Sequence, residues 1–230
     1  MYVAQLHFTQ TLTAKIAGEL GVKAPMSIEQ EINKKFGEKA FERPVFYSNP
    51  GGLRFELSEG GDWLEQFQVA YGKALEICSD IFDDNITVCV RIFGGRSLLS
   101  VLSVLRELRE IGLFPSVSME HWKEKNEEDP EWATDENEYW HTIAYTLPNK
   151  SLNKLLWCSL ACDQGIKPCP PAIYYLFNLK KSIEVWPYDD RGMDVVGPNQ
   201  EYLSALYSKY SHYLLEYDKK IMDEGFASKP

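Results

Sequence analysis

The sequence has no apolar run long enough to cross a membrane, and little cysteine. No uninterrupted apolar stretch approaches the roughly 18 residues that a bilayer-spanning helix needs. The first eight residues lack the basic start and long apolar run of a secretion signal. Five cysteines are an odd number in a chain of 230 residues, which argues against a disulfide framework and for reduced, buried thiols. We therefore expect a cytoplasmic protein.

Basic residues are also in short supply. The chain has 24 lysines and arginines against 34 aspartates and glutamates, a net charge of −10. Long-range electrostatics therefore disfavour nucleic acid or an anionic membrane as the partner, and a basic protein partner fits better. There is neither an internal repeat nor a linker rich in serine or proline. The length predicts one α/β domain over residues 37–230, preceded by an N-terminal helical extension over residues 1–36.

Hydrophobic periodicity and capping residues predict where the chain forms helices and strands. Ser27 with Gln30, and Asp62 with Glu65, have the spacing of a capping box at a helix N-terminus. Leu53–Leu57 alternates apolar and charged residues, which predicts a half-buried strand. The periodicity predicts helices over residues 4–20, 28–36, 62–82, 98–111, 151–163, from about 200, and 213–226. It predicts strands over residues 53–57, 86–93, 139–147 and 173–177, and on each side of a turn at residues 189–192.

Helices separate the early predicted strands, whereas the last strands follow one another as hairpins. This order predicts the α+β variety of the α/β class, a mixed, largely antiparallel central sheet with packed helices. We expect the helix over residues 62–82 to turn its inner face to this sheet. That face is made of Trp63, Phe67, Ala70, Ala74, Ile77, Cys78 and Ile81.

The turn between the last two strands has the most distinctive local chemistry in the chain. Asp189 and Asp190 can bond the amides of the turn, Arg191 can pair with either of them or with Asp194, and Gly192 can adopt a positive φ. Three aspartates are also candidates for a divalent-cation site or for paired catalytic carboxylates. Arg191 would compete with a metal for these carboxylates, so we favour a structural turn.

Two further groups of residues are candidates for chemical sites. Cys158 and Cys162 share one helix face and Cys169 follows, but the sequence places no fourth zinc ligand, so buried thiols are the favoured interpretation. A cysteine nucleophile with His141 or His212 remains an alternative. The step Gly94–Ser97 before a helix would suit an anion, and an ordinary strand-to-helix turn explains it more simply.

Residues 120–138 differ from everything around them. They contain nine acids against Lys123 and Lys125, most of the net charge of the chain, which predicts a solvated loop. Acidic side chains steer a basic partner, and tryptophan is enriched in binding hot spots. The alternative is a loop whose tryptophans fold back on the core. The candidate partner-binding residues are Trp122, Glu127, Glu128, Asp129, Glu131, Trp132, Asp135 and Glu136.

Several segments together resemble a bacterial family known as domain of unknown function thirty-eight eighty-five. The most specific is Tyr188–Val195, followed by the C-terminal segments Leu206–Tyr210 and Leu214–Asp218. The others are Arg43–Tyr47, Gly52–Leu57 and Phe82–Asp84, so that the resemblance covers about residues 40–226. The family supplies neither an enzymatic activity nor catalytic residues. The resemblance implies that the run from Asp189 to Asp194 is a fold signature, and that similar proteins are immunity proteins encoded beside secreted polymorphic or contact-dependent toxins.

We therefore expect an immunity protein, not an enzyme, that binds a cognate toxin domain and covers its active site. A nuclease is the expected toxin, because nucleases need basic substrate grooves that an acidic surface can occupy as a mimic of phosphate. Neither a cofactor nor a metal is expected, and a monomer is favoured. The alternatives are a metal-dependent hydrolase that uses Asp189, Asp190 and Asp194, and a regulatory module that self-associates.

Overall fold

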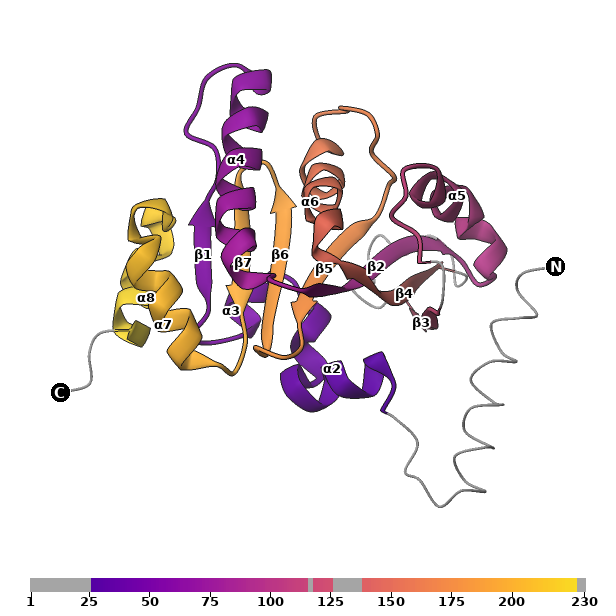
Figure 1. Cartoon of the computed structure of the whole chain (residues 1–230), viewed down its shortest axis with the longest axis horizontal. Coiled ribbons are helices and arrows are strands. Elements are labelled where there is room, and N and C mark those ends of the chain that lie inside the picture. Colours follow the sequence, from indigo (N-terminus) through magenta and orange to yellow (C-terminus); the bar gives the residue numbers. More distant parts are fainter. Residues whose placement is uncertain (1–25, 116–117, 126–137, 227–230) are drawn as a thin grey trace.

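The computed structural model describes residues 26–115, 118–125 and 138–226. The helix predicted over residues 4–20 lies outside these ranges. The seven strands within them form one sheet, in the order β1-β7-β6-β5-β2-β4-β3 (Figure 1). They are β1 (Leu53–Glu56), β2 (Asn85–Gly95), β3 (Glu120–Lys125), β4 (Glu138–Pro148), β5 (Ile173–Asn178), β6 (Ile183–Asp189) and β7 (Gly192–Val196).

Every pair of neighbouring strands in this sheet is antiparallel. The predicted α+β class with a largely antiparallel sheet is therefore confirmed. The parallel pairing that a mixed sheet allows does not occur among the described strands. The helices are α2 (Ile28–Phe36), α3 (Val45–Ser48), α4 (Trp63–Ile81), α5 (Leu102–Glu110), α6 (Leu152–Ala161), α7 (Gln200–Lys209) and α8 (Lys219–Phe226), and the 3-10 turn η1 spans Gly37–Phe41.

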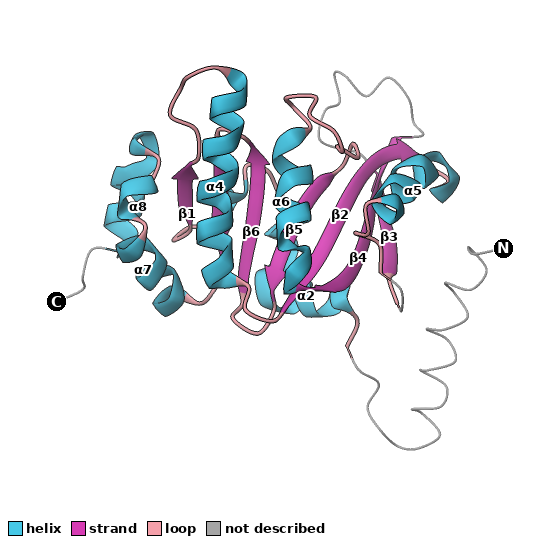
Figure 2. Cartoon of the chain, turned by 45° about the horizontal axis from the view of Figure 1, so that its top comes forward, coloured by secondary structure: helices cyan, strands magenta, loops and turns pink. Residues whose placement is uncertain are grey.

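The helices cover the two faces of the sheet unequally. Helices α4, α5 and α6 cross one face and enclose the main core (Figure 2). Helix α2, η1 and α3 cover the other face and enclose a second core that contains Ile32, Val45, Tyr175, Phe177 and Trp186. Side chains alternate between the faces of a strand, so strands buried on both faces supply residues to both cores.

Helix α2 is an integral part of this second core. Ile32 is fully buried there, and the ring of Phe36 lies 5.2 Å from that of Phe177 on β5. The described part of the predicted extension is thus packed on the sheet. Residues 1–25 lie outside the described ranges. The domain boundary between residues 36 and 37 therefore stays a prediction.

Both predicted capping boxes are present. The Ser27 hydroxyl accepts from the amide of Gln30, and the Asp62 carboxylate accepts from the amides of Leu64 and Glu65. These contacts satisfy N–H groups that the first helical turn leaves free. The predicted inner face of α4 is buried except for Trp63, which is 56% exposed. That assignment was wrong because this residue lies in the first turn of the helix.

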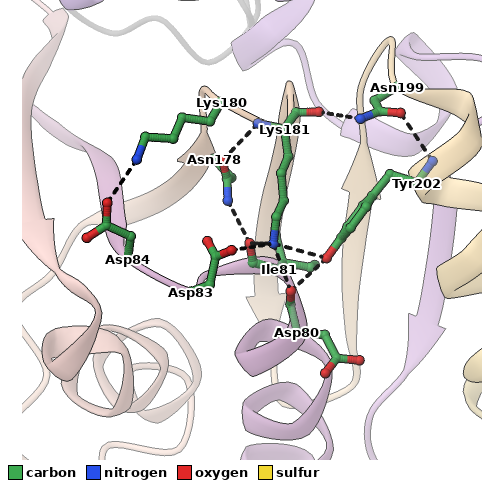
Figure 3. Close-up of polar contacts among 9 residues, drawn as sticks. All are labelled: Asp80, Ile81, Asp83, Asp84, Asn178, Lys180, Lys181, Asn199 and Tyr202. Atoms are coloured by element: carbon green, nitrogen blue, oxygen red, sulfur yellow. Dashed lines mark hydrogen bonds and ion pairs between the residues drawn. The ribbon is translucent and has the colours of Figure 1, made fainter.

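A group of hydrogen bonds connects the C-terminal end of α4 to the turn between β5 and β6 (Figure 3). The Lys181 ammonium donates to the carbonyls of Asp80 and Ile81 at 3.1 and 3.0 Å. Asn178 donates to the Ile81 carbonyl at 2.6 Å, and the Tyr202 hydroxyl donates to that of Asp80 at 2.6 Å. A cation at a helix C-terminus meets carbonyls that have no partner within the helix. Capping of the α4 C-terminus therefore explains these hydrogen bonds.

None of the helices in the described ranges combines the length and the apolar character needed to cross a bilayer.

Candidate functional site

The two edges of the sheet differ, and the predicted site residues lie at both of them. At one edge, the C-terminal segment covers β1. The Leu215 amide donates to the Arg54 carbonyl at 2.9 Å, Leu214 forms a bridge with Phe55, and the Arg54 amide lies 3.2 Å from the Met222 sulfur. The sequence predicted one helix over residues 213–226. The chain is instead extended at Leu214 and Leu215, because these residues pair with the strand, and α8 begins only at Lys219.

A buried ion pair lies directly beneath this covered edge. The Arg54 guanidinium on β1 donates from Nε and Nη2 to the Asp194 carboxylate on β7, at 2.7 and 2.9 Å. The Phe46 amide donates to the same carboxylate at 2.9 Å. Arg54 is 8% exposed, so the prediction that its side of the strand faces solvent was wrong, because α3 and the C-terminal segment cover it.

Aromatic rings and a second carboxylate complete the surroundings of Arg54. Its guanidinium carbon lies 5.0, 4.7 and 5.6 Å from the ring centroids of Phe46, Tyr47 and Tyr188. Its Nη1 lies 3.4 Å from Asp218, which also accepts from the Tyr47 hydroxyl at 2.9 Å. Burial favours a neutral guanidinium, but the bonds to Asp194 outweigh it and raise the pKa of Arg54. Arg54 is therefore a cation in the folded protein, and Asp194 is its main partner.

The turn between β6 and β7 is stabilised by its own side chains, as predicted. The Asp189 carboxylate accepts from the Arg191 amide and from Arg191 Nε, both at 2.8 Å. The neighbouring Asp190 accepts instead from the Gln164 side chain at 2.9 Å. Asp189 and Asp190 are both buried, whereas the side chain of Arg191 is 78% exposed.

Gly192 is needed in this turn for a different reason from the predicted one. Its φ is outside the positive range that favours glycine. A Cβ added at this position would lie 1.9 Å from the Tyr188 hydroxyl and 3.0 Å from the Phe55 carbonyl. Gly192 therefore allows the Tyr188 ring to lie across the strand, where the same ring contacts Arg54.

The three aspartates of the predicted cluster do not act together. Asp189 is bound to Arg191, Asp190 to Gln164, and Asp194 to Arg54. Within the described ranges, no group of three or more histidine, cysteine, aspartate and glutamate side chains is arranged to hold a metal ion. The geometry therefore offers no observation in favour of the hydrolase alternative.

Glu184 on β6 lies on the side of the sheet that faces the second core, and its carboxyl group has no hydrogen-bond donor among the described residues. It is fully buried, and neither of its oxygens has a hydrogen-bond partner. It faces Val196 on one neighbouring strand and Phe177 on the other. Burial, together with the nearby Asp194, raises the pKa of Glu184 well above its ordinary value. The side chain is therefore protonated under conditions in which an exposed glutamate would be charged.

At the opposite edge, the start of the acidic segment is a strand and not the predicted solvated loop. Glu120–Lys125 form β3, which pairs with β4 over its whole length. Trp122 is half-buried; its ring lies 6.2 Å from that of Phe41, and its indole N–H donates to Glu124 at 3.3 Å. The loop prediction failed here because pairing with β4 and packing against η1 outweigh the local excess of acids.

The remaining predicted partner-binding residues lie outside the described residues. They are Glu127, Glu128, Asp129, Glu131, Trp132, Asp135 and Glu136. Their place in the chain is nevertheless informative. They fall between Lys125 and Glu138, the end of β3 and the start of β4, so the most acidic run of the sequence begins and ends at this edge of the sheet.

A second buried arginine joins β3 to the sheet. Arg91 on β2 is 4% exposed and donates to the Glu124 carboxylate at 2.8 Å and to the Phe41 carbonyl at 3.2 Å. The guanidinium carbons of Arg91 and Arg43 each lie 5.2 Å from the ring centroid of Trp140. Glu120 accepts from the amides of Ile28 and Glu29 at the start of α2. Acidic side chains of β3 thus hold the strand to its own domain.

The cysteines and histidines do not form the alternative nucleophilic pair. Burial raises the pKa of Cys158 and of Cys162 to about 12, so both are thiols at neutral pH. The buried His141 instead lies beside His121, with Nδ1 3.0 Å from the His121 Nε2, and its own Nε2 lies 2.7 Å from the Gly95 carbonyl.

Sequence reasoning missed Arg54 and Arg91 as central residues. In both strands the charged residue sits between apolar neighbours, Leu53 and Phe55 or Val90 and Ile92. Around Arg54 the alternation of apolar and charged residues predicts a solvent-facing side chain. The one signal for Arg54 was that it and Asp194 both lie in segments that carry the family resemblance. The segment around Arg91 offered no such signal.

The fold defines an α+β domain with helices on both faces of an antiparallel sheet. The family described as Domain of unknown function (DUF3885) matches residues 28–218, so the chain belongs to this family. The match begins at the first residue of α2 and ends at Asp218, the second carboxylate beside Arg54. No curated protein and no solved structure gave a significant match.

Proposed function

We propose that this protein is an immunity protein, which binds and neutralises a cognate bacterial toxin domain. The observation that carries the proposal is that the acidic run connects the outermost strand of the described sheet to its neighbour. Residues 126–137, which link β3 to β4 along the chain, contain six acids and no lysine or arginine. Negative charge at the rim of a domain speeds encounter with a basic partner.

The chemistry of the described residues supports binding over catalysis. Asp189, Asp190 and Asp194 each have a separate donor. The thiols of Cys158 and Cys162 are protonated at neutral pH. A nuclease is the toxin class that we favour, because an acidic surface can occupy a basic groove that normally receives phosphates.

The test begins with the tagged full chain as bait in bacteria that express its neighbouring genes. A stoichiometric partner is then expressed alone and together with this chain. We expect the partner to be toxic alone, the chain to restore growth, and the complex to weaken with rising salt. A partner whose toxicity is unchanged by this chain, or no partner at all, would overturn the proposal.

A charge-reversal variant tests the acidic run itself. Changing Glu127, Glu128, Asp129 and Glu131 to lysine should slow association with the partner by about tenfold or more, because steering depends on local charge. The matched control changes four exposed acids elsewhere, Glu42, Glu110, Glu201 and Glu224, to lysine. Both variants have the same net charge. Equal slowing in both would remove the acidic run from the binding site.

A further inference from the structure

Within the described ranges, no further strand pairs with the outer side of β3, which is called the open edge below. β3 is the last strand of the sheet, and β4 is its one partner among the described residues. At the opposite edge, β1 is covered by Leu214, Leu215 and Met222. Unpaired N–H and C=O groups at an edge are a template for a further strand, and proteins usually cover or disrupt such an edge. Among the residues that the structure describes, the chain covers the β1 edge and leaves the β3 edge without a strand partner.

The two sides of β3 carry opposite charges. His121 pairs in register with Ile143, a residue of the main core, whereas Glu120 pairs with Ala144 of the second core. Because side chains alternate along a strand, His121, Lys123 and Lys125 lie on the side of the main core. Glu120, Trp122 and Glu124 lie on the other side. The edge therefore presents two exposed lysines on one side, and on the other Trp122 with Glu124, which is exposed although it accepts from Arg91.

This arrangement disfavours a second copy of the same strand. Two antiparallel copies are related by a twofold axis perpendicular to the sheet, which keeps each side chain on its own side. In the closest registers Glu120 would face Glu124, or Lys123 would face Lys123. Like charges directly opposite each other destabilise a strand pair.

We propose that β3 binds an extended segment of a partner protein by strand addition, and that acidic residues alternate with arginines or lysines in that segment. Its acids would face Lys123 and Lys125, whereas His121 is bonded to His141. Its cations would face Trp122, through the face of the indole ring, and Glu124, whose side chain is 47% exposed. Main-chain hydrogen bonds would supply affinity, and the charge alternation would supply specificity. This inference deepens the proposed function, since it rests on a protein partner.

Two synthetic peptides of equal composition test the proposal on the labelled full-length protein by nuclear magnetic resonance. One alternates arginine and glutamate; the other repeats Arg-Arg-Glu-Glu, which mixes both charges on each side of a strand. We expect the alternating peptide to shift the amides of β3 and to bind about fivefold or more tightly than the other, because several cross-strand charge pairs act together. Equal binding, or no shift in β3, would overturn the proposal.

Peptide backbone modification separates strand addition from simple charge attraction. Methylating alternate amide nitrogens of the alternating peptide removes the donors on one of its edges. We expect one set of methyl groups to abolish the shifts in β3 and the other set to preserve them. Identical effects of the two sets would contradict strand addition.

A protein variant keeps this inference distinct from the proposed function. Changing Lys123 and Lys125 to glutamate should weaken binding of the alternating peptide by about fivefold or more, whereas changing the exposed Lys34 and Lys220 to glutamate should not. If a captured toxin binds the first variant as tightly as the wild type, strand addition fails and the proposed function stands. If the alternating peptide binds β3 but this chain neutralises no captured toxin, strand addition stands and the proposed function fails.

Discussion

The covered edge and the open edge of the sheet use charged residues in opposite ways. At β1, Arg54 is buried and bound by Asp194, with Asp218 3.4 Å away, and the C-terminal segment occupies the outer side of the strand. At β3, Lys123 and Lys125 are exposed, and Glu124, although it accepts from the buried Arg91, is still 47% exposed. The comparison teaches that one edge is completed by the chain itself, whereas the other presents charge outward. Substitutions at the two edges should therefore have very different consequences.

The largest effect is expected from breaking the buried pair at the covered edge. Changing Asp194 to alanine leaves the Arg54 cation buried without its main partner, which should destabilise the fold by about 3–5 kcal/mol. Urea unfolding measures this loss. The control, Lys180 to alanine, breaks an ion pair with Asp84 in which both side chains are exposed, and it should cost less than about 1 kcal/mol. Similar losses in both variants would show that burial at this edge is not decisive.

The C-terminal cover should contribute almost as much. Leu214 is 6% exposed, and its change to alanine should cost about 2–4 kcal/mol through lost burial and the cavity left behind. We also expect faster hydrogen exchange at the Leu215 amide, which donates to the Arg54 carbonyl. The exposed Ile221 is the matched control, with an expected loss below about 0.5 kcal/mol. Unchanged exchange at Leu215 in the Leu214 variant would contradict the covering role.

Between the two edges, Glu184 should make stability depend on pH. Its pKa is raised in the folded protein, so the folded state retains a proton that the unfolded state releases above its ordinary pKa. Stability is therefore greatest below that ordinary pKa and falls as the pH rises toward the raised value.

The isosteric variant Glu184 to glutamine tests this pH dependence. It should be more stable than the wild type at pH 8, because no buried proton has to be retained. The difference should vanish near pH 4. Unfolding measured across this range gives the result, with Glu201 to glutamine as an exposed control. A variant that loses equal stability at both pH values would show that the carboxyl has an essential partner.

The smallest effect is expected at the open edge. Changing Lys123 and Lys125 to glutamate should alter the free energy of unfolding by less than about 0.5 kcal/mol, because both side chains are exposed. The same double variant should nonetheless weaken peptide binding to β3. Thermal unfolding beside the peptide titration checks both expectations. A large loss of stability would mean that this edge is structural, like the covered one.

Local chemistry explains which parts of this fold were predictable. Ser27 and Gln30, or Asp62 and Glu65, lie three residues apart, so their capping contacts depend only on the helix that they begin. The strands of the last hairpin and the Asp189 turn are equally local. Prediction failed where distant segments meet. Arg54 and Asp194 are 140 residues apart, and the alternation around Arg54 fits a solvent-facing side chain until α3 and the C-terminal segment cover it.

The sequence by itself determined the helices that begin at Ile28, Trp63 and Leu152, the class of the sheet and the internal bonds of the Asp189 turn, because these follow from periodicity, caps and short-range hydrogen bonds. Only the tertiary structure decided that Arg54 and Arg91 are buried, that Asp194 leaves the turn to bind Arg54, and that Glu120–Lys125 form an edge strand. The physical reason is that burial depends on the second layer packed over a strand. Here that layer comes from α2, η1, α3 and the C-terminal segment, which lie far from most of these strands in the chain.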